Sequence, residues 1–232
     1  MEKLVYVLWC PSGASADDFS TELRSAATGW SGLGARRVVV NVVDRFVEPA
    51  MSARLTHLEP PPMAVVSFWL DACDDRGPIE AELARRTARF AGYLVVESVP
   101  LVNTTRKAGP GERTRGINMI ALIERPERIP YERWIEHWHG HHKRVALETQ
   151  CTYAYVRNVV VRPLTADAPP WAGIVEEGFP AEAVTDPMLW YRAEGSPETL
   201  EKNLGRMIES VQAFLDIDKV ESHPMSEYRI SE

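Results

Sequence analysis

The residues best suited to chemistry lie in one short segment, Tyr131–Ala146, which holds four of the six histidines of the chain. In a helix of about 3.6 residues per turn, Trp134, Trp138 and His142 form one row, because they are spaced four residues apart. An imidazole with an ordinary pKa of about 6.5 can give or take a proton at neutral pH. His142 is therefore a candidate general acid or base between apolar indole walls. The structural alternative is a core histidine that satisfies a backbone carbonyl.

Other polar and aromatic side chains would complete such a site. Tyr153 and Tyr155 share one face of an expected strand, where they could donate hydrogen bonds to a ligand or fill the core. Glu176 and Glu177 point to opposite faces of another strand, so at most one of them can orient the His142 ring. His139 is expected on the solvent face of the helix. We predict catalytic roles for His142, His137 and Tyr155, and substrate contacts from Trp134, Trp138, Tyr131, Tyr153, His141 and Glu176.

The histidines could also bind a metal ion, although the pattern does not favour it. His137 and His141 are spaced i, i+4 and could reach one ion. A third ligand would have to come from Glu176, Glu177 or His223, and the chain has no H-E-x-x-H motif. The glycine patterns of Rossmann and Walker nucleotide sites are absent as well. We therefore expect neither a metal nor a cofactor.

Hydrophobic periodicity and helix-start signals indicate the same order of elements in both halves: strand, helix, strand, strand, helix, strand. In the first half the expected elements are Leu4–Trp9, Phe19–Ala27, Arg37–Val47, Met63–Leu70, Pro78–Phe90 and Tyr93–Val99. In the second half they are Ile117–Glu124, Pro130–Glu148, Thr152–Arg162, Ala172–Gly178, Pro197–Leu215 and Lys219–Met225. The segment Pro180–Arg192 fits either a loop or a short extra helix.

The two halves also resemble each other in sequence. The string Val96–Leu101 recurs 124 residues later as Val220–Met225. The element order is that of the ferredoxin-like unit, a four-stranded sheet with two helices on one face. We therefore predict an α+β fold of tandem ferredoxin-like halves, residues 1–102 and 117–232, joined by an exposed linker over 103–116. The two sheets would pack face to face, with the ligand cavity in the barrel between them.

Composition excludes several classes of protein. The chain has 232 residues, of which 45% are hydrophobic and 25% charged, as in ordinary folded domains. A formal net charge of −7 disfavours a nucleic-acid binder. The apolar run Met63–Leu70 is too short to cross a bilayer, so no membrane partner is expected. Three separated cysteines without a Cys-x-x-Cys pair fit a reduced cytosol, and we predict a cytoplasmic location.

One family resemblance covers roughly Gly116–Ile230. The pattern Trp134-x-x-His137-Trp138-x-x-x-His142 resembles the helix signature of the EthD family, and Gly173–Phe179 resembles the third strand of that family. Lys143 and Arg144 depart from it, because the family has a small residue and a proline after the histidine. The first half is similar to a degenerate copy, in which the aligned row Phe19, Leu23, Ala27 lacks the histidine.

The resemblance implies a dimeric α+β barrel, and some EthD members or relatives are linked to dehydration, isomerisation or cyclisation without a cofactor. We therefore expect a cofactor-independent enzyme that acts by proton transfer on a small aromatic or polyketide-like molecule. We also expect a homodimer with one competent site per chain, in the second half. A non-enzymatic ligand-binding or assembly protein is the first alternative. A haem or metal protein is the second, because tandem ferredoxin-like halves also occur in haem proteins similar to chlorite dismutases.

Overall fold

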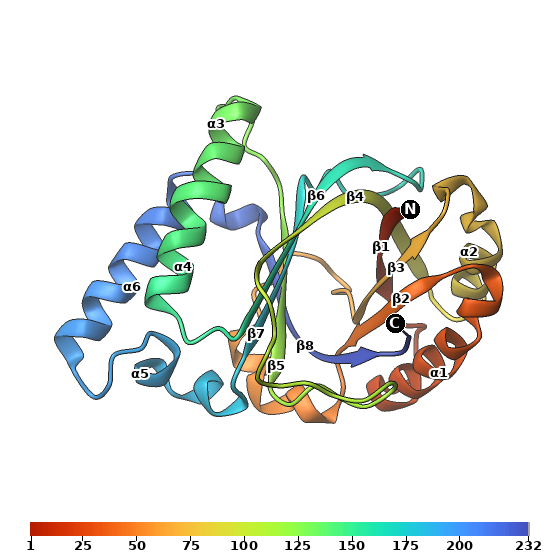
Figure 1. Cartoon of the computed structure of the whole chain (residues 1–232), viewed down its shortest axis with the longest axis horizontal. Coiled ribbons are helices and arrows are strands. Elements are labelled where there is room, and N and C mark those ends of the chain that lie inside the picture. The colour runs from red at the N-terminus through yellow and green to blue at the C-terminus, as the bar shows by residue number, and fades with distance from the viewer. Residues whose placement is uncertain (232) are drawn as a thin grey trace.

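The computed structural model describes residues 1–231. Eight antiparallel strands form one closed barrel in the order β1-β3-β2-β8-β5-β7-β6-β4, and the helices lie outside it (Figure 1). Strands β1–β4 come from the first half of the chain, and strands β5–β8 come from the second half. An α+β barrel is therefore confirmed as the overall fold.

The first half contains the elements expected from its sequence. Its strands are β1 (Glu2–Trp9), β2 (Arg36–Val42), β3 (Ala64–Leu70) and β4 (Arg89–Leu101), and its helices are α1 (Ala16–Thr28) and α2 (Gly77–Ala84). The Ser15 hydroxyl accepts a hydrogen bond from the Asp18 backbone N–H and so begins α1 where the Ser-Asp signal indicates. β2 ends earlier than expected, because the Asp44 carboxylate accepts from the Phe46 backbone N–H and begins the 3-10 helix Arg45–Ala53.

The second half repeats this order, with two main helical segments, 131–149 and Pro197–Gln212, that are longer than α1 and α2. Its strands are β5 (Ile117–Ile123), β6 (Ala154–Pro163), β7 (Gly173–Phe179) and β8 (Glu221–Arg229). Its helices are α3 (Tyr131–Glu136), α4 (Lys143–Thr149), α5 (Pro187–Trp190) and α6 (Pro197–Gln212). A π-helical turn, His137–His142, joins α3 to α4. The segment expected as a loop or extra helix contains α5 and a 3-10 helix, Ala181–Thr185.

The two sheets pair along their edges in addition to packing across the barrel interior. Each half has the same strand order, β4-β1-β3-β2 and β8-β5-β7-β6. The outer strands then pair across the halves, β2 with β8 and β4 with β6. Within residues 1–231, hydrogen bonds along both seams leave no free sheet edge, which is how barrels avoid edge-to-edge association. Closure of this barrel therefore requires no second copy of the chain.

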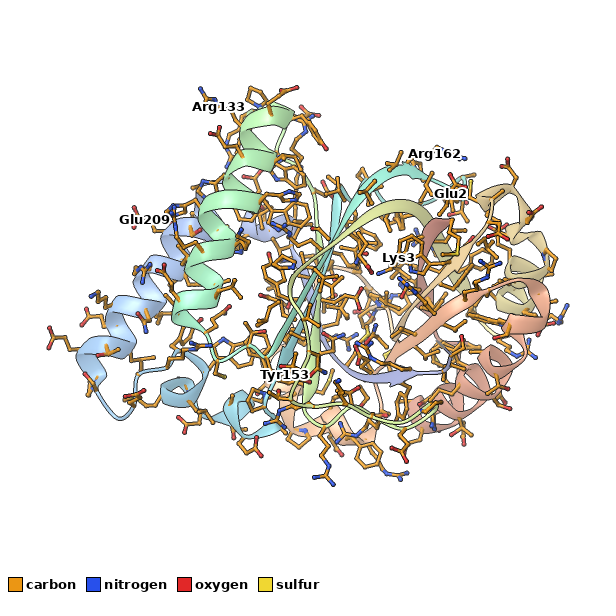
Figure 2. All side chains as sticks on the ribbon, in the orientation of Figure 1. Glu2, Lys3, Arg133, Tyr153, Arg162 and Glu209 are labelled. Carbon is orange, nitrogen blue, oxygen red and sulfur yellow. The ribbon has the colours of Figure 1, made fainter. Side chains whose placement is uncertain are left out.

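Helices cover the outer faces of the barrel, and side chains occupy its interior. Helices α1 and α2 cover the outer face of β1–β3, and α3, α4 and α6 lie on the far side of the strands of the second half (Figure 1). The barrel interior is packed at one end by apolar residues that include Trp9, Val43 and Ile120. The other end of the interior is polar and contains Lys3, which Figure 2 places among the strands.

The connection between β4 and β5 is mostly exposed, but its end is hydrogen-bonded to the barrel. The Gly111 backbone N–H donates to the Arg229 carbonyl at 2.7 Å, and the Thr114 N–H donates to the Glu227 carbonyl at 2.9 Å. Residues 111–114 thus run beside β8. No helix within residues 1–231 combines the length and apolar character needed to cross a membrane.

Candidate active site

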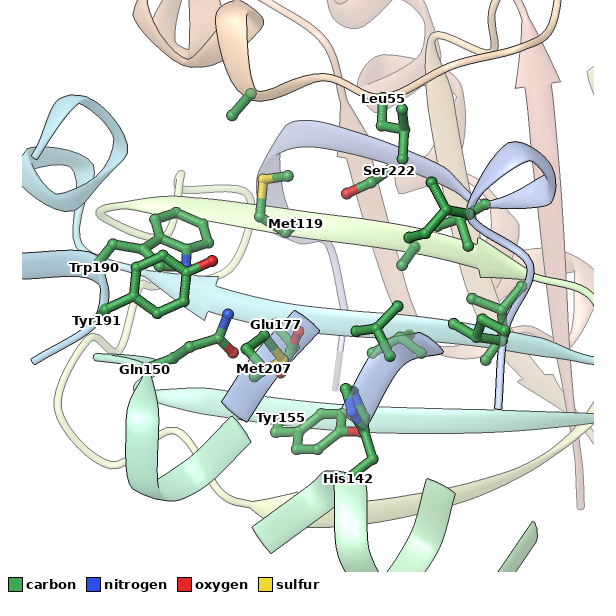
Figure 3. Close-up of a pocket in the computed structure, with 18 of the residues that line it drawn as sticks. Leu55, Met119, His142, Gln150, Tyr155, Glu177, Trp190, Tyr191, Met207 and Ser222 are labelled. Carbon is green, nitrogen blue, oxygen red and sulfur yellow. The ribbon is translucent and has the colours of Figure 1, made fainter. Parts of the chain in front are cut away.

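A cavity of about 500 Å³ lies between the outer face of β5–β8 and the helices of the second half (Figure 3). The cavity that His142 lines is thus outside the barrel, whereas we expected it in the barrel interior between the halves. Its walls are mostly apolar and include Met119, Val175 and Phe214. Six polar or amphipathic side chains also line it: His142, Gln150, Tyr155, Glu177, Tyr191 and Ser222.

The equivalent layer of the first half is filled by aromatic rings. Tyr6 and Phe68 stack with their centroids 5.6 Å apart, and the Trp30 ring meets Phe68 edge-on at 5.7 Å. All three are buried against Leu23 of α1 in one apolar cluster. Large rings thus occupy in the first half the layer that holds a cavity in the second.

His142 faces the cavity from the π-helical turn and is held from behind by α6. Its Nδ1 lies 3.0 Å from the Ser210 hydroxyl, and its ring packs against Phe214 with centroids 4.8 Å apart. Burial, followed by the nearby His137 and His141 rings, lowers the pKa of His142 to about 4. The imidazole is therefore neutral at pH 7 and offers Nε2 as its remaining hydrogen-bonding atom.

The π-helical turn also changes the position of His139, which a regular helix would place in solvent. The i→i+5 hydrogen bonds of a π turn break the 3.6-residue projection. The His139 ring is half-buried, with its centroid 5.0 Å from that of Trp138. Burial, then the charges of Arg157 and Lys143, lowers the pKa of His139 to about 4. The expected solvent-facing position of His139 was wrong for this reason.

Tyr155 and Glu177 face the cavity from neighbouring strands. They lie directly opposite each other in the register of β6 and β7, so their side chains share one face at about 5 Å between Cβ atoms. Burial raises the pKa of Glu177 to about 7. Burial, followed by the Glu177 charge, raises the pKa of the Tyr155 hydroxyl above its ordinary value. At neutral pH the Glu177 carboxyl group is therefore partly ionised and lies beside the neutral Tyr155 phenol.

Glu176 points the other way, as strand alternation requires, and does not line this cavity. It lies inside the barrel, where its Oε1 accepts from the Asn158 amide at 3.0 Å and lies 3.5 Å from Lys3 Nζ. Glu177, and not Glu176, therefore lines the cavity with His142. The sequence shows that only one of the two can face the cavity, but the choice depends on the register of β7 with β6.

The remaining predicted site residues divide into three groups. Trp138 lines the cavity, whereas Trp134 is fully buried beside it, 4.9 Å away between ring centroids. Tyr131 is 49% exposed at the start of α3, and the Tyr153 hydroxyl donates to the Arg115 carbonyl outside the cavity. His137 and His141 line a separate, open hollow on the outer side of α3 and α4. The expected roles of five side chains are thus not supported by a position in the cavity lining: Trp134, Tyr131, Tyr153, His137 and His141.

Several lining residues have little local signal in the sequence. Gln150 follows α4, Tyr191 follows α5, and Ser222 points outward from β8 between two inward-facing neighbours. Long-range packing brings them together. Only the aromatic pair Trp190-Tyr191, in a segment of ambiguous periodicity, could have been singled out as a pocket wall.

Metal and haem binding have little support in this donor set. Within residues 1–231, no group of three or more His, Cys, Asp or Glu side chains is placed to hold an ion. His142 could supply one imidazole to an iron. In the part of the chain that the structure describes, however, the cavity lining includes no lysine or arginine to pair with the two propionates of a haem. These residues therefore do not fit a haem.

The arrangement can support proton transfer to and from a largely apolar molecule. A carboxyl group with a pKa near the ambient pH is an effective general base or acid. A neutral imidazole and a neutral phenol can donate hydrogen bonds to an oxygen that becomes negatively charged. Mostly apolar walls around these groups strengthen both effects, because they limit competing water.

Comparison with known proteins finds similarity of fold only. No family model matches the chain, and no curated protein matches it. A crystal structure described as an anthrone oxidase-like protein superposes with a TM-score of 0.60 at 9% identity, over 100% of this chain and 94% of that chain. A putative monooxygenase from Lactobacillus acidophilus NCFM superposes with a TM-score of 0.50 at 8% identity, over 99% of this chain and 96% of that chain. The chain therefore shares the overall fold of these proteins.

Proposed function

We propose that the chain is a cofactor-independent enzyme that moves a proton beside a carbonyl group of a small, largely apolar molecule. The observation that carries this proposal is the Glu177–Tyr155 pair, which together with His142 lines a cavity with mostly apolar walls. Burial sets the pKa of Glu177 to about 7, so a useful fraction is ionised at neutral pH.

In the first step the Glu177 carboxylate takes a proton from the carbon next to the carbonyl. The C–H electron pair becomes the C=C bond of an enolate, and the carbonyl π electrons move to the oxygen. His142 Nε2–H and the Tyr155 hydroxyl donate hydrogen bonds to that oxygen. This requires the Nε2–H tautomer, in which the Ser210 hydroxyl donates to His142 Nδ1.

Three reactions can then follow, depending on which atom receives the proton from Glu177. Return to a different carbon gives isomerisation. Transfer to a departing β-hydroxyl releases water and gives dehydration. Attack of the enolate carbon on a second carbonyl, with the proton delivered to the new alkoxide, gives cyclisation. Atoms and charges balance in each case, and no redox partner is needed.

The shape and chemistry of the cavity support an aromatic or polyketide-like ketone as substrate. A volume of about 500 Å³ is within the usual range for small-molecule sites. Trp138, Phe214 and Trp190 provide flat apolar surfaces on different sides. The anthrone oxidase-like neighbour supports the same class, because an anthrone is a tricyclic aromatic ketone.

The finer assignments belong with this proposal. We propose an EthD-like enzyme built from tandem ferredoxin-like halves, residues 1–102 and 117–232, with 103–116 between them. The repeated strand order supports the two halves. A cytoplasmic homodimer without metal stays our expectation, to be checked by sedimentation and elemental analysis. If a purified sample shows a Soret band, the haem alternative replaces this proposal.

Proton exchange tests the function without knowledge of the natural substrate. Anthrone and 1-tetralone serve as probes in D₂O, and NMR follows exchange of the carbon-bound protons that the carbonyl acidifies. We expect wild-type protein to accelerate exchange and Glu177→Gln to lose most of the acceleration, about 10²–10⁴-fold. Glu176→Gln, one residue away but outside the cavity, is the matched control and should retain it. Saturable binding without exchange would favour the non-enzymatic alternative instead.

A further inference from the structure

A second cavity, of about 490 Å³, opens at the polar end of the barrel interior. Strands from both halves contribute its lining, and the proposed active site lies on the other face of the sheet. Lys3 of β1, Ser67 of β3, Asn118 of β5 and Glu176 of β7 point into it and are each more than nine-tenths buried. This cavity therefore has a wall of buried polar groups that the proposed reaction does not use.

The floor of this cavity holds two carboxylates and one ammonium, and Arg229, whose charge also acts on Glu176 and Glu97, is paired with Glu227. Lys3 Nζ lies 2.5 Å from Glu97 and 3.5 Å from Glu176, so one ammonium faces two carboxylates. A buried ion pair contributes little net stability, because desolvation of the charges offsets their attraction. The opposite end of the same barrel is filled by apolar side chains. Packing alone thus gives no reason for this charged floor.

Several floor groups retain hydrogen-bonding capacity. Among residues 1–231, the Ser67 hydroxyl and Asn118 Oδ1 make no hydrogen bond, and the Asn118 amide already donates to Asn41 at 2.9 Å. Glu97 uses only one carboxylate oxygen, on Lys3. The free capacity is mostly that of acceptors, so the floor suits a ligand group that donates several hydrogen bonds.

The rim of the cavity has the opposite charge. Arg229 is paired with Glu227 at 3.1 Å, whereas Arg37 makes no ion pair within the described residues, and its guanidinium lies 5.8 Å from the centre of the Trp69 ring. Arg37 has a φ of +51°, in the left-handed region, at a shift in the register of β2 against β3. A bulge of this kind re-aims a side chain and is common beside functional sites.

We propose that this cavity binds a small zwitterion, an amino-acid-like molecule with its ammonium group at the floor and its carboxylate at the rim. The ammonium would contact Glu97, Glu176 and Asn118 Oδ1, and the carboxylate would contact Arg37. Val39, Val99 and Val156 line the space between these ends and suit a short carbon chain. A ligand with both charges matches a negative floor and a positive rim, whereas a singly charged ligand matches only one of them.

Calorimetric titration with defined probes tests this site. The zwitterions are γ-aminobutyrate and 6-aminohexanoate, and the singly charged analogues are butylamine and butyrate. We expect saturable binding of a zwitterion at least about tenfold tighter than that of either analogue. Glu176→Gln and the rim variant Arg37→Gln should each weaken binding by about tenfold or more.

Glu177→Gln is the matched control, because its side chain faces the other cavity. It should leave zwitterion binding unchanged, so failure of the proposed reaction and failure of this site are distinguishable. Melting temperatures show whether each variant is folded. If Glu176→Gln does not fold, Arg37→Gln still tests zwitterion binding. Absence of zwitterion binding at millimolar concentration, equal binding of butylamine, or loss of binding in Glu177→Gln would overturn the proposal.

Discussion

Two adjacent glutamates show how strongly the position of a residue decides its chemistry. Glu176 lies among amides and an ammonium inside the barrel, and Glu177 faces an apolar cavity on the other side of the same strand. Desolvation without a compensating cation raises the pKa of Glu177 to about 7. We therefore assign the proton-transfer role to Glu177 and treat His142 as a neutral hydrogen-bonding partner.

The raised pKa of Glu177 has a consequence for stability. The folded protein holds this proton up to pH about 7, whereas the unfolded chain releases it near pH 4.5. Stability from this group is therefore complete below pH 4.5 and is lost as pH rises through 7. Glu177→Gln should be more stable than wild type at pH 8, by about 1–3 kcal/mol, with little difference at pH 4. Urea unfolding at both pH values measures this, and an equal difference at both would contradict it.

Ser210 positions the His142 ring, and the first half supplies a control for it. Ser210→Ala leaves His142 Nδ1 without a partner, so we expect a loss of about 1–3 kcal/mol and slower ketone exchange. Ser20 on α1 is also buried, but its hydroxyl has no hydrogen-bond partner within residues 1–231. Ser20→Ala should be neutral or stabilising and leave exchange unchanged. Thermal unfolding and the exchange assay on both variants separate positioning of the His142 ring from simple burial of a hydroxyl. Equal effects of Ser210→Ala and Ser20→Ala on stability and exchange would refute the positioning role.

At the scale of elements, the π-helical turn between α3 and α4 is the feature that the sequence pattern did not reveal. Projection at 3.6 residues per turn correctly places Trp138 and His142 toward the sheet but misplaces His139. Gly140 inside the turn is the one local signal of irregularity. A π turn depends on hydrogen bonds between residues five apart, which side-chain periodicity does not encode.

Gly140 is needed neither for space nor for an unusual backbone conformation. A Cβ at this position would have no heavy atom within 4 Å, and its φ is not positive. Gly140→Ala should therefore stabilise the protein by about 0.5–1 kcal/mol through the lower entropy of the unfolded chain. Chemical denaturation measures the gain, and the exchange activity serves as the control. A destabilised variant would mean that the turn needs glycine.

Strand predictions were more accurate than helix details because alternation is a local property. Every expected strand exists, but Tyr153 precedes β6 and does not share the cavity face of Tyr155. The end of β2 could not be located, because it depends on the Asp44 carboxylate and the 3-10 helix that follows. The choice between Glu176 and Glu177 required the pairing of β7 with β6, which is a contact between segments distant in the chain.

At the scale of the whole molecule, the two halves have the same strand order, but the layer between the strands and the helices is packed differently in each. Aromatic rings fill the layer under α1, whereas a cavity remains under the helices of the second half. The repeat in the sequence predicts the common strand order. Closure into one barrel and the hollow second half depend on seam pairing and on packing between distant residues, which a single sequence does not express.

Buried neutral histidines should make the whole fold sensitive to acid. Burial lowers the pKa of His142 to about 4, and burial with the Arg54 charge lowers that of His223 to about 3. Their stabilisation is complete above pH 6.5 and is lost as pH falls toward these values, by roughly 1–2 kcal/mol for each ring. Thermal unfolding from pH 7 to pH 4 should show this decline. A smaller decline in a His223→Gln variant that stays folded would assign part of it to His223.

The central claim is that Glu177 is the general base in the second-half cavity, and the pH dependence of ketone exchange tests it most directly. In wild-type protein the rate of probe exchange per enzyme should rise with pH and level off above the Glu177 pKa of about 7, because only the ionised carboxylate accepts the proton. In Glu177→Gln this pH-dependent rise should disappear. A wild-type profile already level above pH 5, or an unchanged rise in Glu177→Gln, would contradict the claim.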